Sequence, residues 1–247
     1  MAAASLFLAL SLLAEIAGTV GGFGSSVYFV PIANWFFDFA SVLGITALFH
    51  LASNLSKLGL FRHGIDARLL LWMGVPSLLF AVLGALASAR VAVPALQLLL
   101  AGFLLVPSLW MLARPRWVLA ASPRNAVLGG VFSGGMAGLV GTGGALRGMT
   151  LAAFDLPKHV FVATSAAIDM GIDLARSVVY FRNGYIHGHD LHWIPLLALV
   201  ALLGTWLGRL LLQRIPQPWF RRIALGLVCA VGVATLVQVL AGGQAAG

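Results

Sequence analysis

Apolar runs long enough to cross a lipid bilayer recur along this sequence from one end to the other. About 30 Å of hydrocarbon requires roughly 20 residues in a helix. Hydrophobic residues make up 61% of the 247 residues and charged residues only 9%, a balance that a water-soluble domain does not tolerate on its surface. We therefore predict a single transmembrane domain over residues 1–247. The apolar runs cover residues 2–37, 40–61, 67–89, 93–112, 126–154, 157–181, 190–212 and 219–241.

The net charge of +8 would suggest a nucleic-acid partner for a soluble protein. Here, however, Lys and Arg gather in the gaps between apolar runs, as they do in the cytoplasmic loops of membrane proteins. The expected partner is the lipid bilayer, with no nucleic acid. The single cysteine, Cys229, and the lack of a metal-binding motif predict no disulfide, no metal and no other cofactor. Five tryptophans lie near the ends of runs, as interfacial anchors do: Trp35, Trp110, Trp117, Trp193 and Trp219.

The first and fifth runs differ from the others because glycines interrupt them. The interruptions are Gly18, Gly21, Gly22 and Gly24 in the first run and Gly138, Gly141, Gly143 and Gly144 in the fifth run. Glycine disfavours a continuous helix. As one straight helix, residues 2–37 would extend about 54 Å, well beyond the hydrocarbon thickness. Each run is therefore predicted to form a helix, a break and a shorter returning helix.

The sequence also repeats itself. A shift of 120 positions lays residues 17–21 on 137–141 and residues 61–64 on 181–184. A shift of 119 lays one spaced set of polar residues on another. These sets are His50, Asn54 and Lys57 in the first half and Asp169, Asp173 and Arg176 in the second. The chain is thus predicted to be a tandem duplication, with repeat one at 1–112 and repeat two at 124–241.

The distribution of basic residues predicts how the two repeats are oriented. If every run crosses the membrane, seven basic residues lie on one side and six on the other, and this difference is too small to indicate which side is cytoplasmic. If runs one and five are hairpins, the second repeat is inverted and the count becomes eleven against two. The eleven are Lys57, Arg62, Arg68, Arg114, Arg116, Arg124, Lys158, Arg209, Arg214, Arg221 and Arg222, and the two are Arg90 and Arg182.

The predicted fold class is therefore an all-α integral membrane protein of two inverted repeats, each a glycine-broken helical hairpin plus three transmembrane helices. The basic face is expected in the cytoplasm and both termini on the opposite face, in a multi-pass protein of the cell inner membrane. Broken helices in inverted repeats mark the substrate site of many secondary transporters. The short helices after Gly24 and Gly144 would point free N–H groups inward, which suits an anion. Alternatively, the glycines only allow helices to pack closely.

The glycine-rich segments resemble those of the TauE/SafE family of sulfite and organosulfonate exporters. The resemblance rests on residues 18–24 followed by Pro31, on residues 138–144, and on Thr46 and Thr164-Ser165 near the start of the next helices. It implies a membrane anion transporter for sulfite or an organosulfonate. The two breaks are then predicted to line one shared cavity that binds the anion. The predicted substrate-binding residues are Gly21, Gly22, Gly24, Ser25, Ser26, Gly141, Thr142, Gly143, Gly144, Ala145 and Arg147.

Charged residues inside apolar runs are costly and need a reason. Arg147 is expected either to pair with the oxygens of the anion, to snorkel towards headgroups, or to form an ion pair with Asp169 or Asp173. Asp169, Asp173 and His50 are candidates for coupling transport to protons, the alternatives being a salt bridge to Arg176 for the aspartates and a core position for the histidine.

Two further charged residues lie in the first half. Lys57 is expected to snorkel towards the basic face, and Glu15 to be a buried partner of Arg147 or His50.

The function predicted first is a secondary anion exporter that works by alternating access, coupled to protons or to the membrane potential, since the sequence has no nucleotide-binding loop. The alternatives are a passive anion channel and a protein for delivery or uptake of sulfur compounds. An intramembrane hydrolase with Ser25 or Ser26 as nucleophile and His50 as base is a remote alternative, because the Gly-x-Ser-x-Gly motif is lacking. We thus expect no enzyme activity. A homo-oligomer is compatible with the sequence.

Overall fold

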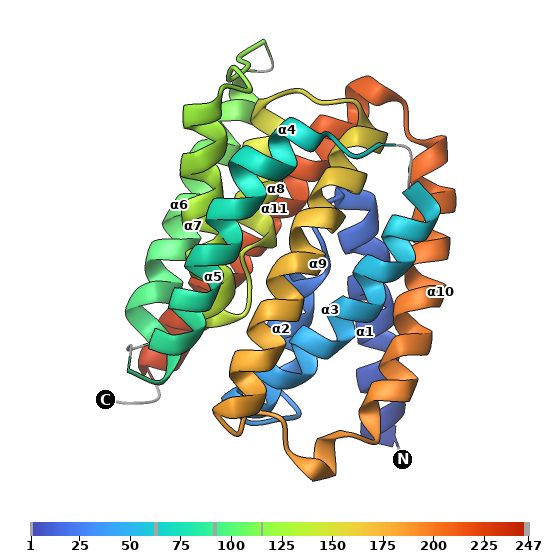
Figure 1. Ribbon diagram of the computed structural model, residues 1–247, viewed down its shortest axis with the longest axis vertical. Coiled ribbons are helices and arrows are strands. Elements are labelled where there is room, and N and C mark those ends of the chain that lie inside the picture. Colours follow the sequence, from blue (N-terminus) through green and yellow to red (C-terminus); the bar gives the residue numbers. More distant parts are fainter. Residues whose placement is uncertain (1, 62–63, 91–92, 115, 245–247) are drawn as a thin grey trace.

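The computed structural model describes residues 2–61, 64–90, 93–114 and 116–244, and its regular structure there is entirely helical (Figure 1). The helices of the first half are α1 (Ala2–Gly21), α2 (Ser26–Ala33), α3 (Phe39–Phe61), α4 (Ala67–Leu69), the π-helix η1 (Leu70–Gly74), α5 (Val75–Ala87), the 3-10 helix η2 (Ser88–Arg90) and α6 (Val93–Ala113). Those of the second half are α7 (Pro123–Val140), α8 (Gly144–Ala153), α9 (Lys158–Arg182), the 3-10 helix η3 (Gly188–Asp190), α10 (Trp193–Arg214) and α11 (Gln217–Gln244).

Within the described residues, five helical segments are long and apolar enough to span a membrane: Ala3–Gly21, Phe39–Phe61, Ala67–Ala87, Trp193–Arg214 and Gln217–Leu240. Leu79 and Leu83 of α5 are 58% and 57% exposed, as expected for a helix face in contact with hydrocarbon. α9 is 25 residues long, and its charged residues Asp169, Asp173 and Arg176 are buried inside the molecule. The chain is therefore a multi-pass membrane protein, as the apolar runs predict.

Both glycine-rich runs are interrupted where the sequence predicts. α1 ends at Gly21 and α2 begins at Ser26, while α7 ends at Val140 and α8 begins at Gly144. Gly24 has φ +90° and Gly141 has φ +77°, backbone conformations that other residues rarely adopt. The chain turns back at each break, so α2 packs on α1 and α8 packs on α7.

The long helices pack in pairs along the long axis of the molecule. α1 packs on α10, α5 on α7, α3 on α9, and α6 on α11. α3 and α9 run side by side through the middle of the molecule in Figure 1. Near the start of α1, Phe7 packs against Phe29, Phe36, Phe37 and Trp193 in an aromatic cluster. Trp193 thus belongs partly to the core, whereas the other four predicted anchors are at least 40% exposed.

The connections gather at the two ends of the molecule. In Figure 1 the connections α3–α4, α6–α7, α8–α9 and α10–α11 lie at the upper end, while α1 begins and α11 ends at the lower end. Most of the basic residues flank the upper connections, and Arg90 and Arg182 flank lower ones. Residues 62–63, which belong to the repeat match and include Arg62, lie outside the described residues.

Candidate anion site

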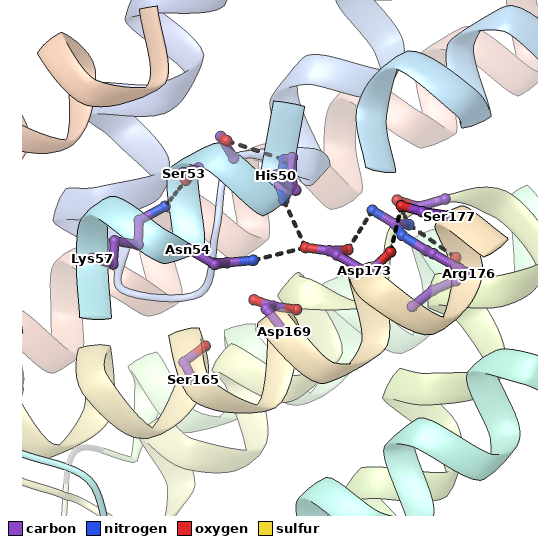
Figure 2. A network of polar contacts seen from close by, with 12 residues as sticks. His50, Ser53, Asn54, Lys57, Ser165, Asp169, Asp173, Arg176 and Ser177 are labelled. Carbon is purple, nitrogen blue, oxygen red and sulfur yellow. Dashed lines mark hydrogen bonds and ion pairs between the residues drawn. The ribbon is translucent and has the colours of Figure 1, made fainter. Parts of the chain in front are cut away.

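A polar network fills the contact between α3 and α9 (Figure 2). His50 and Asn54 of α3 face Asp169 and Asp173 of α9, and all four side chains are buried. The Asn54 amide Nδ2 donates a hydrogen bond to Asp173 Oδ2 at 2.7 Å. These two residues are 119 positions apart, so this bond joins positions that the repeat relates. The network therefore lies where the two halves of the chain meet.

Arg147 of α8 is fully buried at 0% exposure, so the prediction that it snorkels is wrong. Its guanidinium forms an ion pair with Asp169, which is one of the alternatives predicted from the sequence. Nε donates to Ser165 Oγ at 3.0 Å and Nη2 to the Phe23 carbonyl at 3.3 Å. Nη1 is buried and has no hydrogen-bond partner within the described part of the chain. Arg147 Nη1 is thus a buried hydrogen-bond donor that a ligand could use.

Asp173 forms its ion pair with Arg176, with Nη2 and Oδ1 2.8 Å apart. Arg176 Nη1 also donates to the carbonyls of Ala137 at 3.2 Å and Gly141 at 2.9 Å. Those carbonyls end α7, where a helix has no backbone donors left for them and where a cation is favourable. Asp173 therefore has the salt bridge that was the alternative to a coupling role, and Arg176 fixes the position of the second break.

His50 links this network to the first break. Its Nε2 lies 3.1 Å from Ser25 Oγ, and its Nδ1 lies 3.9 Å from Asp173 Oδ2. The second distance is too long for a direct hydrogen bond. Ser25 in turn donates its hydroxyl proton to Glu15. His50 is thus buried, with Ser25 as its hydrogen-bond partner and Asp173 nearby. This fits the satisfied core position that was one alternative from the sequence, and its coupling role stays a prediction.

Glu15 of α1 is the centre of a second cluster, and its carboxylate has 0% exposure. It accepts hydrogen bonds from Lys57 Nζ at 2.7 Å, Ser53 at 2.6 Å, Thr205 at 3.0 Å and Thr19 at 3.3 Å. Two sequence predictions are wrong here. Lys57 is 2% exposed and pairs with a buried acid instead of snorkelling, and the ion-pair partner of Glu15 is Lys57 instead of Arg147 or His50. Lys57 follows Ser53 by one turn of α3, a spacing that marks a polar helix face but does not identify Glu15 as the partner.

The two breaks lie against each other. A Cβ atom added at Gly144 would collide with the Phe23 carbonyl, and one added at Gly148 would collide with the Phe23 side chain. A Cβ at Gly24 would lie 3.3 Å from Asp169 Oδ2 and 3.7 Å from His50 Cε1. The start of α2 and the start of α8 therefore meet next to the buried charges, and the fully buried Phe23 fills the space between them.

The predicted break residues do not all face this meeting point. Gly24, Ser25 and Arg147 contact the polar network directly. Gly22 instead packs against the apolar side chain of Phe161. Gly141 packs against Leu43, while its carbonyl accepts the hydrogen bond from Arg176. Four others are buried at the start of the short helices or just before it: Ser26, Gly143, Gly144 and Ala145. Gly21 packs against the ring of Phe23, and the hydroxyl of Thr142 is buried without a partner among the described residues.

The charges of the network balance. Glu15, Asp169 and Asp173 pair with the three bases Lys57, Arg147 and Arg176. An anion that enters must therefore displace a carboxylate from its partner or arrive together with a proton, because uncompensated buried charge is costly.

Ser25, His50 and Asp173 also occur in the order of a nucleophile, a base and an acid. However, the Ser25 proton is already donated to Glu15, and His50 lies 3.9 Å from Asp173. The arrangement serves as a polar relay better than as a catalytic triad. In the part of the chain that can be described, no group of three or more His, Cys, Asp or Glu side chains is placed to hold a metal ion.

Comparison with known proteins identifies the family. The model of the family "Sulfite exporter TauE/SafE" matches residues 7–235, nearly the whole chain. No curated protein and no solved structure matches this chain.

Proposed function

Because the chain belongs to the sulfite exporter TauE/SafE family, a family of membrane transporters, we propose that it is a secondary transporter that exports sulfite or a small organosulfonate across the cell inner membrane. The proposed site is where the N-termini of α2 and α8 meet. One observation carries the assignment: Arg147 Nη1 is a fully buried cationic donor without a partner among the described residues. An oxyanion is the ligand that such a donor and two helix N-termini favour.

We further propose that the two halves, 1–112 and 124–241, form an inverted repeat that alternates access to the site. The helix pairing supports this. The repeat matches α1 with α7, α5 with α10, α3 with α9 and α6 with α11. The packing of α1 on α10 therefore has its equivalent in the packing of α7 on α5, while α3 packs on α9 and α6 packs on α11. Gly204 packs against Glu15, and Gly84 packs against Gly135. These two contacts are equivalent, because Gly204 lies 120 positions after Gly84 and Gly135 lies 120 positions after Glu15. Rocking one broken hairpin against the other would then expose the site to each side in turn.

Anion and proton are proposed to bind together. Asp169 occupies the guanidinium of Arg147, so the anion and the carboxylate compete for the same cation. Protonation of Asp169 removes its charge and releases Arg147 for the anion. The buried network then stays neutral with the anion bound. One proton then leaves with each exported anion, so the flux of the anion is coupled to the proton gradient, and export is driven by a cytoplasmic excess of the anion that exceeds the inward proton gradient.

Proton uptake on binding tests this proposal directly. Methanesulfonate is a suitable probe because its own charge does not change near neutral pH. Calorimetric titration in buffers of different ionisation enthalpy should reveal about one proton taken up per anion bound. Asp169→Asn should still bind the anion but without proton uptake. Equal uptake in both proteins would refute the coupling role of Asp169, and conductance through proteoliposomes without coupling to pH would favour a passive channel.

A further inference from the structure

A basic pocket lies at the upper end of the molecule, away from the network of buried charges. One cavity of about 650 Å³ is lined by Lys158, Arg221 and Arg222, together with Asp155. These residues belong to the start of α9, the start of α11 and the connection that follows α8. The cavity therefore sits where helices end, at the depth where the headgroups of a bilayer begin.

A second cavity of about 590 Å³ adjoins the first, because Arg222 lines both. Its other basic residues are Arg114 and Arg116, at the end of α6 and just after it. Trp110 and Trp117 also line it, and the Arg114 guanidinium lies 5.0 Å from the centre of the Trp110 ring. We call the two cavities together the α6–α11 pocket.

Hydrogen bonds hold the walls of this pocket in place. Arg221 donates to the carbonyl of Trp117. In the same connection, the Leu119 N–H donates to the Ala153 carbonyl at 2.7 Å. On the other side, the Lys158 N–H donates to Gln217 Oε1 at 2.9 Å. The pocket is thus preformed, so a ligand need not order its walls.

The charge of the pocket is strongly positive. Arg114, Arg116 and Arg222 form no ion pair with a carboxylate anywhere in the described ranges, and Asp155 is the one acidic residue lining the two cavities. Below the pocket, α6 presents an apolar strip in which Val106, Leu109 and Trp110 are 71%, 52% and 51% exposed. The surface therefore fits a ligand with an anionic head and an apolar tail.

We propose that the α6–α11 pocket binds the headgroup of an anionic phospholipid, with its acyl chains along α6. Phosphate oxygens match the guanidinium groups, and basic pockets between helices at the cytoplasmic side favour such headgroups. A small soluble anion would use the same guanidiniums but not the tryptophans or the apolar strip. The assignment does not depend on which anion the protein transports.

Lipid titration of the purified full-length protein in detergent, followed by native mass spectrometry, tests the proposal. Dioleoyl phosphatidylglycerol should bind in clear preference to dioleoyl phosphatidylcholine, which has the same chains. The double variant Arg114→Gln/Arg222→Gln should lose most of this preference, roughly fivefold for each charge removed. The matched control Arg90→Gln/Arg182→Gln removes two charges at the other end of the molecule and should keep it.

Three results would overturn the proposal: equal binding of the two lipids by the wild type, equal loss of preference in the control variant, or displacement of phosphatidylglycerol by millimolar inorganic phosphate. The last result would identify the pocket as a site for soluble anions. Circular dichroism and the elution volume of each variant separate a lost site from a lost fold, and single substitutions of Arg114 and Arg222 replace the double variant if it does not fold.

Discussion

The clusters around Glu15 and around Arg147 each contain a buried ion pair but differ in one respect. Glu15 accepts hydrogen bonds from five side chains on α1, α3, α10 and at the start of α2. Arg147 Nη1 and the hydroxyl of Thr142, which precedes α8 in the sequence, are each buried without a partner among the described residues. Buried donors are normally satisfied, and those that are not call for an explanation. From this difference we propose structural support for the first cluster and anion binding for the second.

Glu15→Gln should have the largest effect on stability, because it leaves Lys57 buried without a counter-charge. Loss of one partner of a buried ion pair costs about 3–5 kcal/mol, which corresponds to a fall in melting temperature on the order of 10 °C. Thermal unfolding in detergent measures it. The double variant Glu15→Gln/Lys57→Met should recover most of the loss. If the single variant binds anion far more weakly while unfolding at the wild-type temperature, the two clusters have been assigned the wrong way round.

Arg147→Gln should have the largest effect on binding. A hydrogen bond to a charged group contributes about 1.5–3 kcal/mol, so anion affinity should fall roughly 10- to 100-fold. The substitution also leaves Asp169 without its partner, so stability should fall as well. Arg147→Gln/Asp169→Asn separates the two effects, because it should restore stability but not affinity. Recovery of affinity in the double variant would show that the anion does not use this guanidinium.

Asp169→Asn should leave anion affinity high and change its pH dependence. In the wild type, affinity should rise as pH falls, because protonation of Asp169 frees Arg147 for the anion. The asparagine carries no charge at any pH, so affinity should vary much less with pH. Binding of methanesulfonate measured between pH 5 and pH 8 checks this. A pH profile identical to that of the wild type would move the coupling role to Asp173 or His50.

Thr142→Val should have the smallest effect. Its hydroxyl has no partner to lose in the described structure, so stability should not fall. If the hydroxyl contacts the anion, affinity should drop about two- to tenfold, as expected for one neutral hydrogen bond. Thr150→Val is the matched control, because the Thr150 hydroxyl already donates to the Leu146 carbonyl of its own helix at 2.9 Å. Equal affinity in both variants would exclude Thr142 from the site.

The apolar pattern predicts the helices well, because lipid enforces helical runs of a minimum length. The breaks at Gly21–Gly24 and Gly141–Gly144 were predicted for a related reason, since glycine is poorly suited to a helix interior. Pairing between helices was harder to predict. Lys57 and Glu15 lie 42 positions apart on different helices, and spacing along one helix carries no information about such a contact. Arg147 illustrates the same limit, since three partners were open from the sequence and only packing selects Asp169.

The three buried ion pairs that involve Lys or Arg each join two residues of the same half: Glu15 with Lys57, Arg147 with Asp169, and Asp173 with Arg176. Hydrogen bonds between the halves instead pair a charged side chain with a neutral group, such as Asp173 with the Asn54 amide, Glu15 with the Thr205 hydroxyl and Arg147 with the Phe23 carbonyl. This matters during synthesis, when the chain enters the bilayer segment by segment. An unpaired charge at the centre of the bilayer costs at least about 2.5 kcal/mol. Lys57 finds its counter-ion within the first 57 residues, so the ribosome can deliver the first half to the membrane with this pair of buried charges already matched before Arg147 has been made.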